Sequence, residues 1–132
     1  MAKVYLVRHG QSLANLKWKY QGQTNDTDLT PLGQIQAKNA SQKLMDKEIK
    51  MIYASPLKRA RQTAEIISQI LKLPVNLDNN LMETDHGDWS FLDDNEVKAK
   101  WPETYEIWRV RPSQVIFPNG EDFQNQTAKR VV

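Results

Sequence analysis

The order of apolar runs and helix starts in the first half of the chain is the feature that most constrains its fold. Residues 3–7 predict a strand buried on both sides, because Val4 to Val7 is apolar on both alternating faces. Thr30-Pro31 predicts a helix start, with a hydroxyl N-cap and proline in the first turn, and the helix runs to about residue 47. Its expected apolar face includes Leu32 and Ile35. Residues 49–54 then predict a second short strand.

The same pattern is repeated once more along the chain. Ser55-Pro56 predicts a second capped helix, which continues to about residue 72. Its apolar positions recur at steps of three and four residues, at Leu57, Ala60, Ala64, Ile67 and Leu71. Residues 75–77 predict a third strand. Strands that alternate with helices favour an α/β fold with a parallel sheet and right-handed crossovers.

The length and composition set further limits. A chain of 132 residues suggests one domain over residues 1–132. The net charge of +2 gives no reason to expect a nucleic-acid partner, and no apolar run is long enough for a membrane span. The sequence has no cysteine, which excludes disulfides and thiol nucleophiles and fits a cytoplasmic protein. We expect no leader peptide.

Arg8-His9-Gly10 follows the first predicted strand directly. In open α/β sheets, ligands bind outside the carboxyl ends of the strands. An imidazole there can act as a nucleophile or base, and a guanidinium can bind an oxyanion with two hydrogen bonds. By itself the tripeptide is a weak signal.

Other segments strengthen that signal. Asn15 lies in the loop that follows, and Arg59 falls in the first turn of the second helix. A cation is unfavourable at a helix N-terminus unless an anion lies between them. Glu83 and the segment 118–122 complete the set. The tryptophans Trp89, Trp101 and Trp108 are expected to be core or pocket-wall residues.

Together these segments resemble the histidine phosphatase superfamily, the phosphoglycerate-mutase-like proteins. The matching motifs are Arg8-His9-Gly10 with Gln11-Ser12 and Asn15, Gln21-Gly22, Asp28-Leu29-Thr30, Gly33 with Gln36-Ala37, Ser55 to Ala64, Glu83 with Gly87 and Trp89, and Pro118 to Glu121. The resemblance implies a three-layer α/β/α fold with a mainly parallel sheet. It also implies that this chain lacks the family's C-terminal strands, so that its one domain is incomplete.

The resemblance implies phosphoryl transfer through a phosphohistidine. In this reading His9 attacks phosphorus as the neutral imidazole, and nearby arginines lower its pKa. Arg8 and Arg59 hold the phosphoryl oxygens. Glu83 protonates the leaving oxygen and then activates water. A partly desolvated pocket would help that acid to keep its proton at neutral pH.

The resemblance also assigns Asn15, Gln21 and Gly22 to substrate binding. No metal and no cofactor are expected. The implied partner is a small phosphorylated metabolite, and sugar phosphates, nucleotide-derived phosphates and ribazole phosphate all remain candidates.

The sequence departs from the family pattern in one important place. The family has a second catalytic histidine in a later His-Gly, but this sequence contains only His9 and His86. We interpret His86 as a pocket-wall or surface residue. Without the later strand, which in relatives lies beside the first strand, the chain should be weakened in activity. It would then either dimerise, by strand swapping for example, or be a fragment.

Three functions remain open at this point. A phosphatase is preferred, because the segment after Glu83 is short and lacks room for the longer insertions of mutases. A phosphoglycerate mutase-type phosphotransferase is the first alternative. A non-catalytic phospho-ligand binding protein is the second, and the missing histidine is the reason to consider it.

Overall fold

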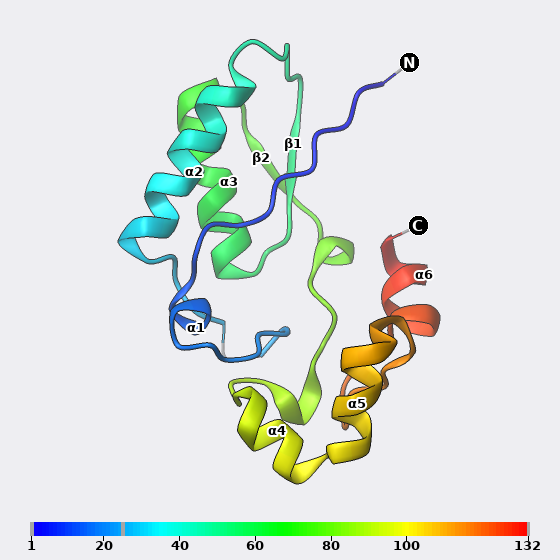
Figure 1. The fold of residues 1–132 in the computed structure, drawn as a ribbon. Helices are drawn as coiled ribbons and strands as arrows, with labels where there is room; N and C mark the ends of the chain where they lie inside the picture. Colours follow the sequence, from blue (N-terminus) through cyan, green and yellow to red (C-terminus); the bar gives the residue numbers. More distant parts are fainter. Residues whose placement is uncertain (1, 25, 132) are drawn as a thin grey trace.

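The structure is a computed structural model that describes residues 2–24 and 26–131. Six α-helices and two strands are formed in this part of the chain (Figure 1). They are α1 (Leu13–Leu16), α2 (Pro31–Leu44), β1 (Ile52–Ala54), α3 (Lys58–Leu71), β2 (Val75–Leu77), α4 (Asp94–Lys100), α5 (Pro102–Val110) and α6 (Ala128–Val131). Short 3₁₀ turns lie at Asn79–Leu81, Gly87–Trp89 and Pro112–Gln114, and a π-helical turn at Phe123–Thr127 precedes α6.

The two strands confirm the predicted α/β class. β1 and β2 pair in parallel, with Ile52 opposite Val75 and Ala54 opposite Leu77. α3 is the crossover between them, as parallel pairing requires. Among the described residues the sheet has these two strands.

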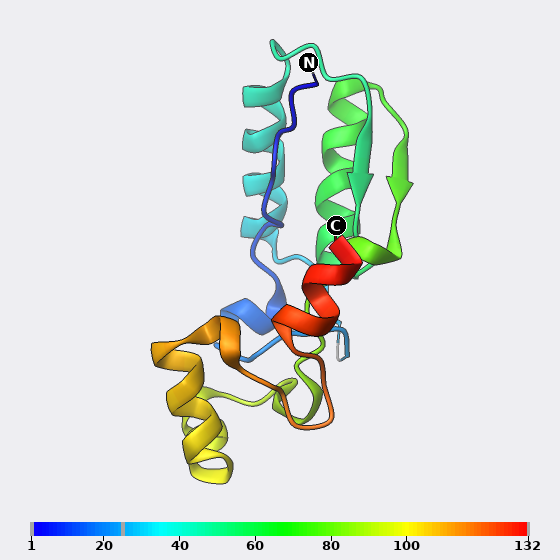
Figure 2. The same ribbon diagram turned by 90° about the vertical axis from the view of Figure 1, so that its right-hand side faces the viewer.

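Helices cover one face of this sheet. α3 packs on β1 and β2, and α2 lies beside α3 (Figure 2). A buried cluster of Ile52, Ala54, Ala64 and Ile67 joins α3 to β1. On the other face Tyr53 is exposed. Of the three layers expected, the described residues therefore form a helical layer and the sheet.

The prediction of a buried strand at residues 3–7 is wrong for this structure. The segment is an extended coil outside the sheet, and its side chains are exposed, with Leu6 reaching 96%. The apolar pattern indicates a segment whose side chains favour burial. A strand forms only when a neighbouring strand accepts and donates the hydrogen bonds of its backbone. No described strand does so here.

The start of α2 follows the local signals, but its buried face does not. The Thr30 hydroxyl accepts a hydrogen bond from the Gly33 N–H, and Pro31 is the first helical residue. The buried positions are Gly33, Ala37 and Ser41, whereas Leu32 and Ile35 are exposed. The expected apolar face is therefore wrong, because small residues permit the close approach of α2 to its neighbours.

The predicted cap of α3 is also wrong in detail. The Ser55 hydroxyl accepts from the Leu57 N–H, one turn before the helix begins. The cap residue of α3 is Leu57, which has no side-chain cap. The Lys58 N–H instead donates to the Asp26 carboxylate, which comes from a distant loop. The N-terminus of α3 is thus capped by Asp26 through a tertiary contact, and not by the local residue Ser55 that the sequence predicted.

A second hydrophobic cluster lies around α4 and α5, in the lower part of Figure 1. Its buried members are Trp89, Val97, Tyr105, Val115 and Phe117. Trp101 and Trp108 pack against them, so the expectation of core tryptophans is confirmed. α4 ends before Trp101, and Pro102 is the first residue of α5.

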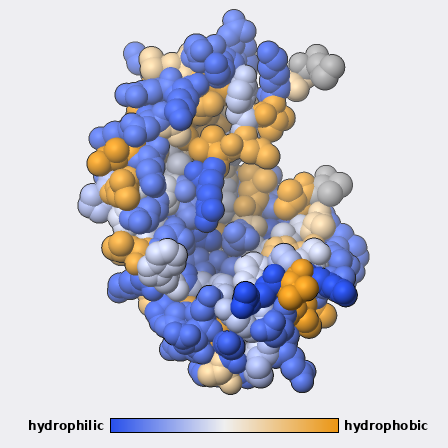
Figure 3. All heavy atoms as spheres, in the orientation of Figure 1, coloured by the Kyte–Doolittle hydropathy of each residue, from blue (hydrophilic) through white to orange (hydrophobic). Residues whose placement is uncertain are grey.

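The space-filling view shows a notch between the part that carries the N-terminus and the part that carries the C-terminus (Figure 3). Apolar residues lie along its rim. Within the described part of the chain, no helix has an apolar stretch of the length that crosses a membrane.

Candidate active site

His9 stands at the point where the extended N-terminal segment turns into the loop before α1, and its ring is half-buried. Its Nδ1 lies 2.7 Å from the Gly10 carbonyl oxygen. A carbonyl oxygen only accepts, so Nδ1 carries the hydrogen and donates it. In the neutral ring the lone pair is therefore on Nε2, which is the atom free to act as a nucleophile.

The surroundings of His9 also favour the neutral ring. Burial is the main cause that lowers the pKa of His9 below its ordinary value of 6.5. The positive charges of Arg59 and Arg8 lower this pKa further, while the Gly10 carbonyl and the Glu83 carboxylate oppose them. The arginines act in the expected direction, but desolvation is the larger cause.

Two glycines fix the backbone beside His9. A Cβ on Gly10 would lie 2.3 Å from the Gly33 carbonyl oxygen, and a Cβ on Gly33 would lie 2.1 Å from the Gln11 carbonyl oxygen. Any side chain here would push the loop away from the first turn of α2. The Gly10 N–H also donates to the Thr63 hydroxyl of α3, at 3.1 Å. The backbone beside His9 is thus held against two helices.

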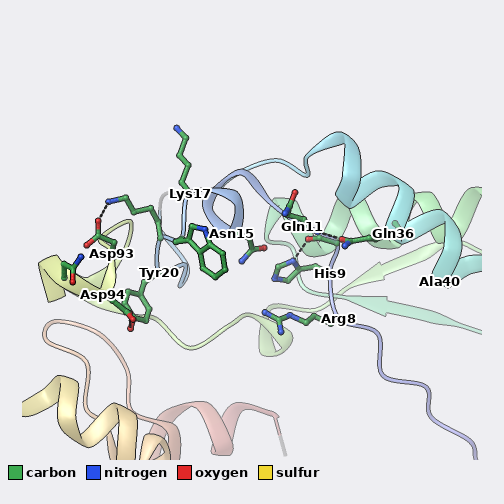
Figure 4. Close-up of a pocket in the computed structure, with 15 residues that line it drawn as sticks. Arg8, His9, Gln11, Asn15, Lys17, Tyr20, Gln36, Ala40, Asp93 and Asp94 are labelled. Carbon is green, nitrogen blue, oxygen red and sulfur yellow. Dashed lines mark hydrogen bonds and ion pairs between the residues drawn. The ribbon is translucent and has the colours of Figure 1, made fainter. Parts of the chain in front are cut away.

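Arg8, His9 and Asn15 line an open cavity of about 950 Å³ (Figure 4). Arg8 is exposed to it, whereas the Asn15 Oδ1 accepts from the Ser12 N–H and hydroxyl, each at 3.0 Å. With Oδ1 occupied, Asn15 offers its Nδ2 hydrogens to a ligand. The far wall of the cavity includes residues that the sequence did not single out, namely Lys17, Trp18, Lys19, Tyr20, Asp93, Asp94 and Asn95.

Arg59 is 2% exposed and is fixed by two contacts. Its guanidinium donates to the Gly22 carbonyl oxygen at 3.1 Å and to the Asp26 carboxylate at 3.3 Å. Burial lowers the pKa of Arg59, although Asp26 and Glu83 oppose this. The group remains a cation at neutral pH, because a guanidinium titrates far above it. Asp26 has no motif or spacing that would identify it in the sequence.

Glu83 is exposed, so the expectation of a partly desolvated pocket around it is wrong for this structure. One carboxylate oxygen, Oε1, accepts from the Thr84 N–H at 2.8 Å. The Glu83 carbonyl accepts from the Gln23 side chain at 2.9 Å. Neither Glu83 nor Arg59 belongs to the lining of the cavity.

Gln21 and Gly22 lie beneath the site. The Gln21 amide donates to the Ser12 hydroxyl at 2.7 Å and accepts from the Thr27 hydroxyl at 3.1 Å, which fixes the loop. A Cβ on Gly22 would lie 2.5 Å from the His86 N, so this glycine allows the loop to touch the segment after Glu83. Neither residue lines the cavity.

His86 packs against the second hydrophobic cluster and does not line the cavity, so the expectation of a pocket-wall or surface residue is wrong. It is 8% exposed and stacks on Phe117, with 4.4 Å between ring centroids. Burial lowers its pKa, and its Nδ1 has no hydrogen-bond partner within the described part of the chain. In the described residues there is no group of three or more acidic, histidine or cysteine side chains placed to hold a metal.

An α/β fold that presents a half-buried histidine and an arginine to one open cavity is typical of a class of proteins that handle phosphoryl groups. The comparison with known families agrees with this class. The model of the histidine phosphatase superfamily (branch 1) matches residues 4–132. The chain belongs to this family.

Characterised relatives include phosphatases and mutases. Phosphoserine phosphatase 1 from Hydrogenobacter thermophilus is 40% identical over 121 residues, which cover 92% of this chain and 57% of that protein. The 2,3-bisphosphoglycerate-dependent phosphoglycerate mutase of Nitrobacter winogradskyi is 38% identical over 130 residues, covering 94% and 62%.

A solved structure of mycobacterial glucosyl-3-phosphoglycerate phosphatase with VO3 superposes with a TM-score of 0.84. It is 33% identical and covers 93% of this chain and 60% of that one. The chain thus spans about 60% of the length of these relatives.

Proposed function

We propose that this chain carries the phosphohistidine site of a phosphatase that hydrolyses small phosphomonoesters. The observation that supports this most directly is the state of His9. Its Nδ1–H is donated to Gly10 and its pKa is lowered, so at neutral pH Nε2 carries a lone pair that can attack phosphorus.

In the proposed reaction His9 Nε2 forms a bond to phosphorus and the ester P–O bond breaks. Arg8 and Arg59 stabilise the charge on the phosphoryl oxygens, and Asn15 donates a hydrogen bond to them. Glu83 gives its proton to the leaving oxygen. Its carboxylate then takes a proton from water as the water oxygen attacks phosphorus, which releases inorganic phosphate and restores neutral His9.

The Gln21–Gly22 segment contributes by positioning. Gln21 fixes the loop, and the Gly22 carbonyl orients Arg59. This reading keeps both residues in the substrate site without direct contact to the cavity. The proposed reaction needs no metal or cofactor, because the guanidinium groups of Arg8 and Arg59 balance the negative charge of the phosphoryl oxygens.

Hydrolysis of an aryl phosphate by the purified chain, beside His9→Ala, tests the proposal. We expect release of inorganic phosphate that falls to the buffer level in His9→Ala, together with an acid-labile phosphoprotein in the wild type. Equal rates in both proteins would overturn the proposal. Transfer of phosphate to an added alcohol in place of release would favour the mutase-type alternative.

A non-catalytic phospho-ligand binder is the second candidate. It is favoured by the scarcity of histidines, because His86 is stacked on Phe117 and lies outside the cavity lining. Orthovanadate binding measured by calorimetry, without any turnover, would support this candidate. For either function we propose that the protein works in the cytoplasm, which is consistent with a sequence without cysteine.

A further inference from the structure

The backbone around Glu83 is held more firmly than its exposed side chain. We call residues 82–87 the acid loop. Among the described residues, the Glu83 side chain accepts one hydrogen bond, from the N–H of the next residue, Thr84. Its position relative to His9 therefore depends on how the acid loop is anchored.

Glu121 provides the main anchor. Its Oε2 accepts from the Asp85 N–H at 2.9 Å, and its own N–H donates to the Asp85 carbonyl oxygen at 2.8 Å. The same Oε2 lies 3.4 Å from the Gln23 Nε2, and that nitrogen donates to the Glu83 carbonyl at 2.9 Å. One carboxylate thus reaches the backbone of the acid loop directly and through Gln23.

Arg130 of α6 completes the arrangement. Its Nη2 lies 2.6 Å from Glu121 Oε2, and both side chains are mostly buried, at 16% and 21% exposure. Its Nη1 donates to the Met82 carbonyl at 2.6 Å. The ion pair therefore contacts backbone groups just before and just after Glu83.

Two packing features leave the acid loop little freedom to move. A Cβ on Gly120 would lie 2.4 Å from the Asp85 carbonyl oxygen, so the two backbones are in direct contact. The fully buried Thr84 hydroxyl lies 2.9 Å from the Thr127 hydroxyl. The loop is therefore clamped between residues 118–121 and the turn that precedes α6.

We propose that Glu121, paired with Arg130, is a positioning residue that sets the geometry of Glu83 for proton transfer. This inference rests on the proposed function of Glu83. In this inference the C-terminal part of the chain positions a reacting group and takes no part in the reaction itself. Small misplacements of a catalytic group can cost large factors in rate, so the ion pair should be visible in kcat.

Glu121→Gln and Arg130→Met test the proposal, with Lys129→Met as the matched control on the exposed side of α6. Two substrates are compared, an alkyl phosphate whose leaving oxygen needs a proton and an aryl phosphate whose phenolate leaves without one. We expect kcat for the alkyl phosphate to fall about 10-fold or more in both variants. The rate of phosphohistidine formation from the aryl phosphate, measured by rapid quench, should change less than about twofold, because this step needs no proton from Glu83. All rates of the control should also change less than about twofold.

A double-mutant cycle identifies the route of the effect. In the Glu83→Gln background, Glu121→Gln should cause no further loss with the alkyl phosphate. An equal loss in the rate of phosphohistidine formation from both substrates, or a full extra loss in that background, would overturn the proposal, because either result indicates general damage to the fold.

Hydrogen exchange separates failure of this proposal from failure of the proposed function. If the wild-type chain shows no turnover dependent on His9, the proposed function fails, while the anchor is still measured through its amides. We expect Glu121→Gln to speed exchange at the Asp85 amide about 10-fold relative to amides of α3. Unchanged exchange at Asp85 would overturn the anchoring role with or without turnover.

Discussion

At the scale of single residues, His9 and Glu83 divide the proposed reaction between a half-buried group and an exposed one. Burial suits the nucleophile, since it keeps the imidazole neutral. Exposure of Glu83 leaves it open to water, which the second half of the reaction consumes. Exposure thus suits the second of the two proposed roles of Glu83, that of base toward water.

Replacing Glu83 should separate the two halves of the reaction. With an aryl phosphate, Glu83→Gln should still form phosphohistidine, because the phenolate leaves without a proton. Hydrolysis of the intermediate should slow by about 10²–10⁴-fold. Rapid-quench measurement of acid-labile phosphate checks this expectation. A variant that accumulates no phosphoprotein, yet still loses turnover, would contradict the assignment of Glu83.

His86 should make the stability of the chain depend on pH. Its pKa in the folded chain lies below 6.5, and unfolding returns it to about that value. Between the two values the unfolded state binds more protons, so the free energy of unfolding falls as the pH drops below about 6.5. Each unit of pKa difference contributes about 1.4 kcal/mol.

The variant His86→Phe keeps a ring against Phe117 and removes the titration. Urea unfolding from pH 8 to pH 5 should show a smaller loss of stability in this variant than in the wild type. The difference in the free energy of unfolding between the two proteins at pH 8, where His86 of the wild type is neutral, measures packing alone. Parallel curves for the two proteins would count against a buried neutral His86.

At the scale of elements, the first turn of α3 depends on a loop far away in sequence. Asp26 caps the Lys58 N–H and pairs with the buried Arg59. Asp26→Ala should lower the free energy of unfolding by about 2–4 kcal/mol, because a cap is lost and a buried cation loses its partner. Asp26→Asn, which keeps a capping oxygen, should cost less.

Ser55→Ala is the matched comparison for the local cap. The Ser55 hydroxyl satisfies only the Leu57 N–H, so its loss should cost less than about 1 kcal/mol. Urea titrations of Asp26→Ala, Asp26→Asn and Ser55→Ala give the order of their losses in the free energy of unfolding. A larger cost for Ser55→Ala than for Asp26→Ala would show that the helix is capped locally after all.

At the scale of the whole molecule, the N-terminal segment is an apolar strand sequence without a partner strand. Exposed apolar segments with free backbone groups promote association. We therefore expect the purified chain to form dimers or larger species. Leu6→Lys should shift it to the monomer and change the free energy of unfolding by less than about 0.5 kcal/mol, because Leu6 is 96% exposed.

Size-exclusion chromatography with light scattering measures both proteins at several concentrations. Lys3→Leu is a control that adds an apolar residue beside the segment and should not reduce association. A wild-type chain that stays monomeric over the whole range would contradict association through residues 4–7.

Many helix boundaries and buried positions can be predicted from short sequence patterns. Thr30-Pro31 begins α2, the spacing of Ala64 and Ile67 marks the buried side of α3, and Pro102 separates α4 from α5. Caps, proline positions and helical periodicity act within a few residues, so a sequence displays them directly. The motif around His9 and the parallel order of β1 and β2 follow from the same level of information.

The tertiary structure decided what depends on groups far apart in the chain. Whether residues 4–7 form a strand depends on a partner strand, and the charge state of His9 depends mainly on how deeply its ring is covered. Asp26 and Glu121 act on residues more than 30 positions away, on Arg59 and Asp85. Sequence determined the local elements and the candidate chemistry, whereas burial and pairing were decided across space, because solvent exclusion and hydrogen-bond partners belong to the folded chain as a whole.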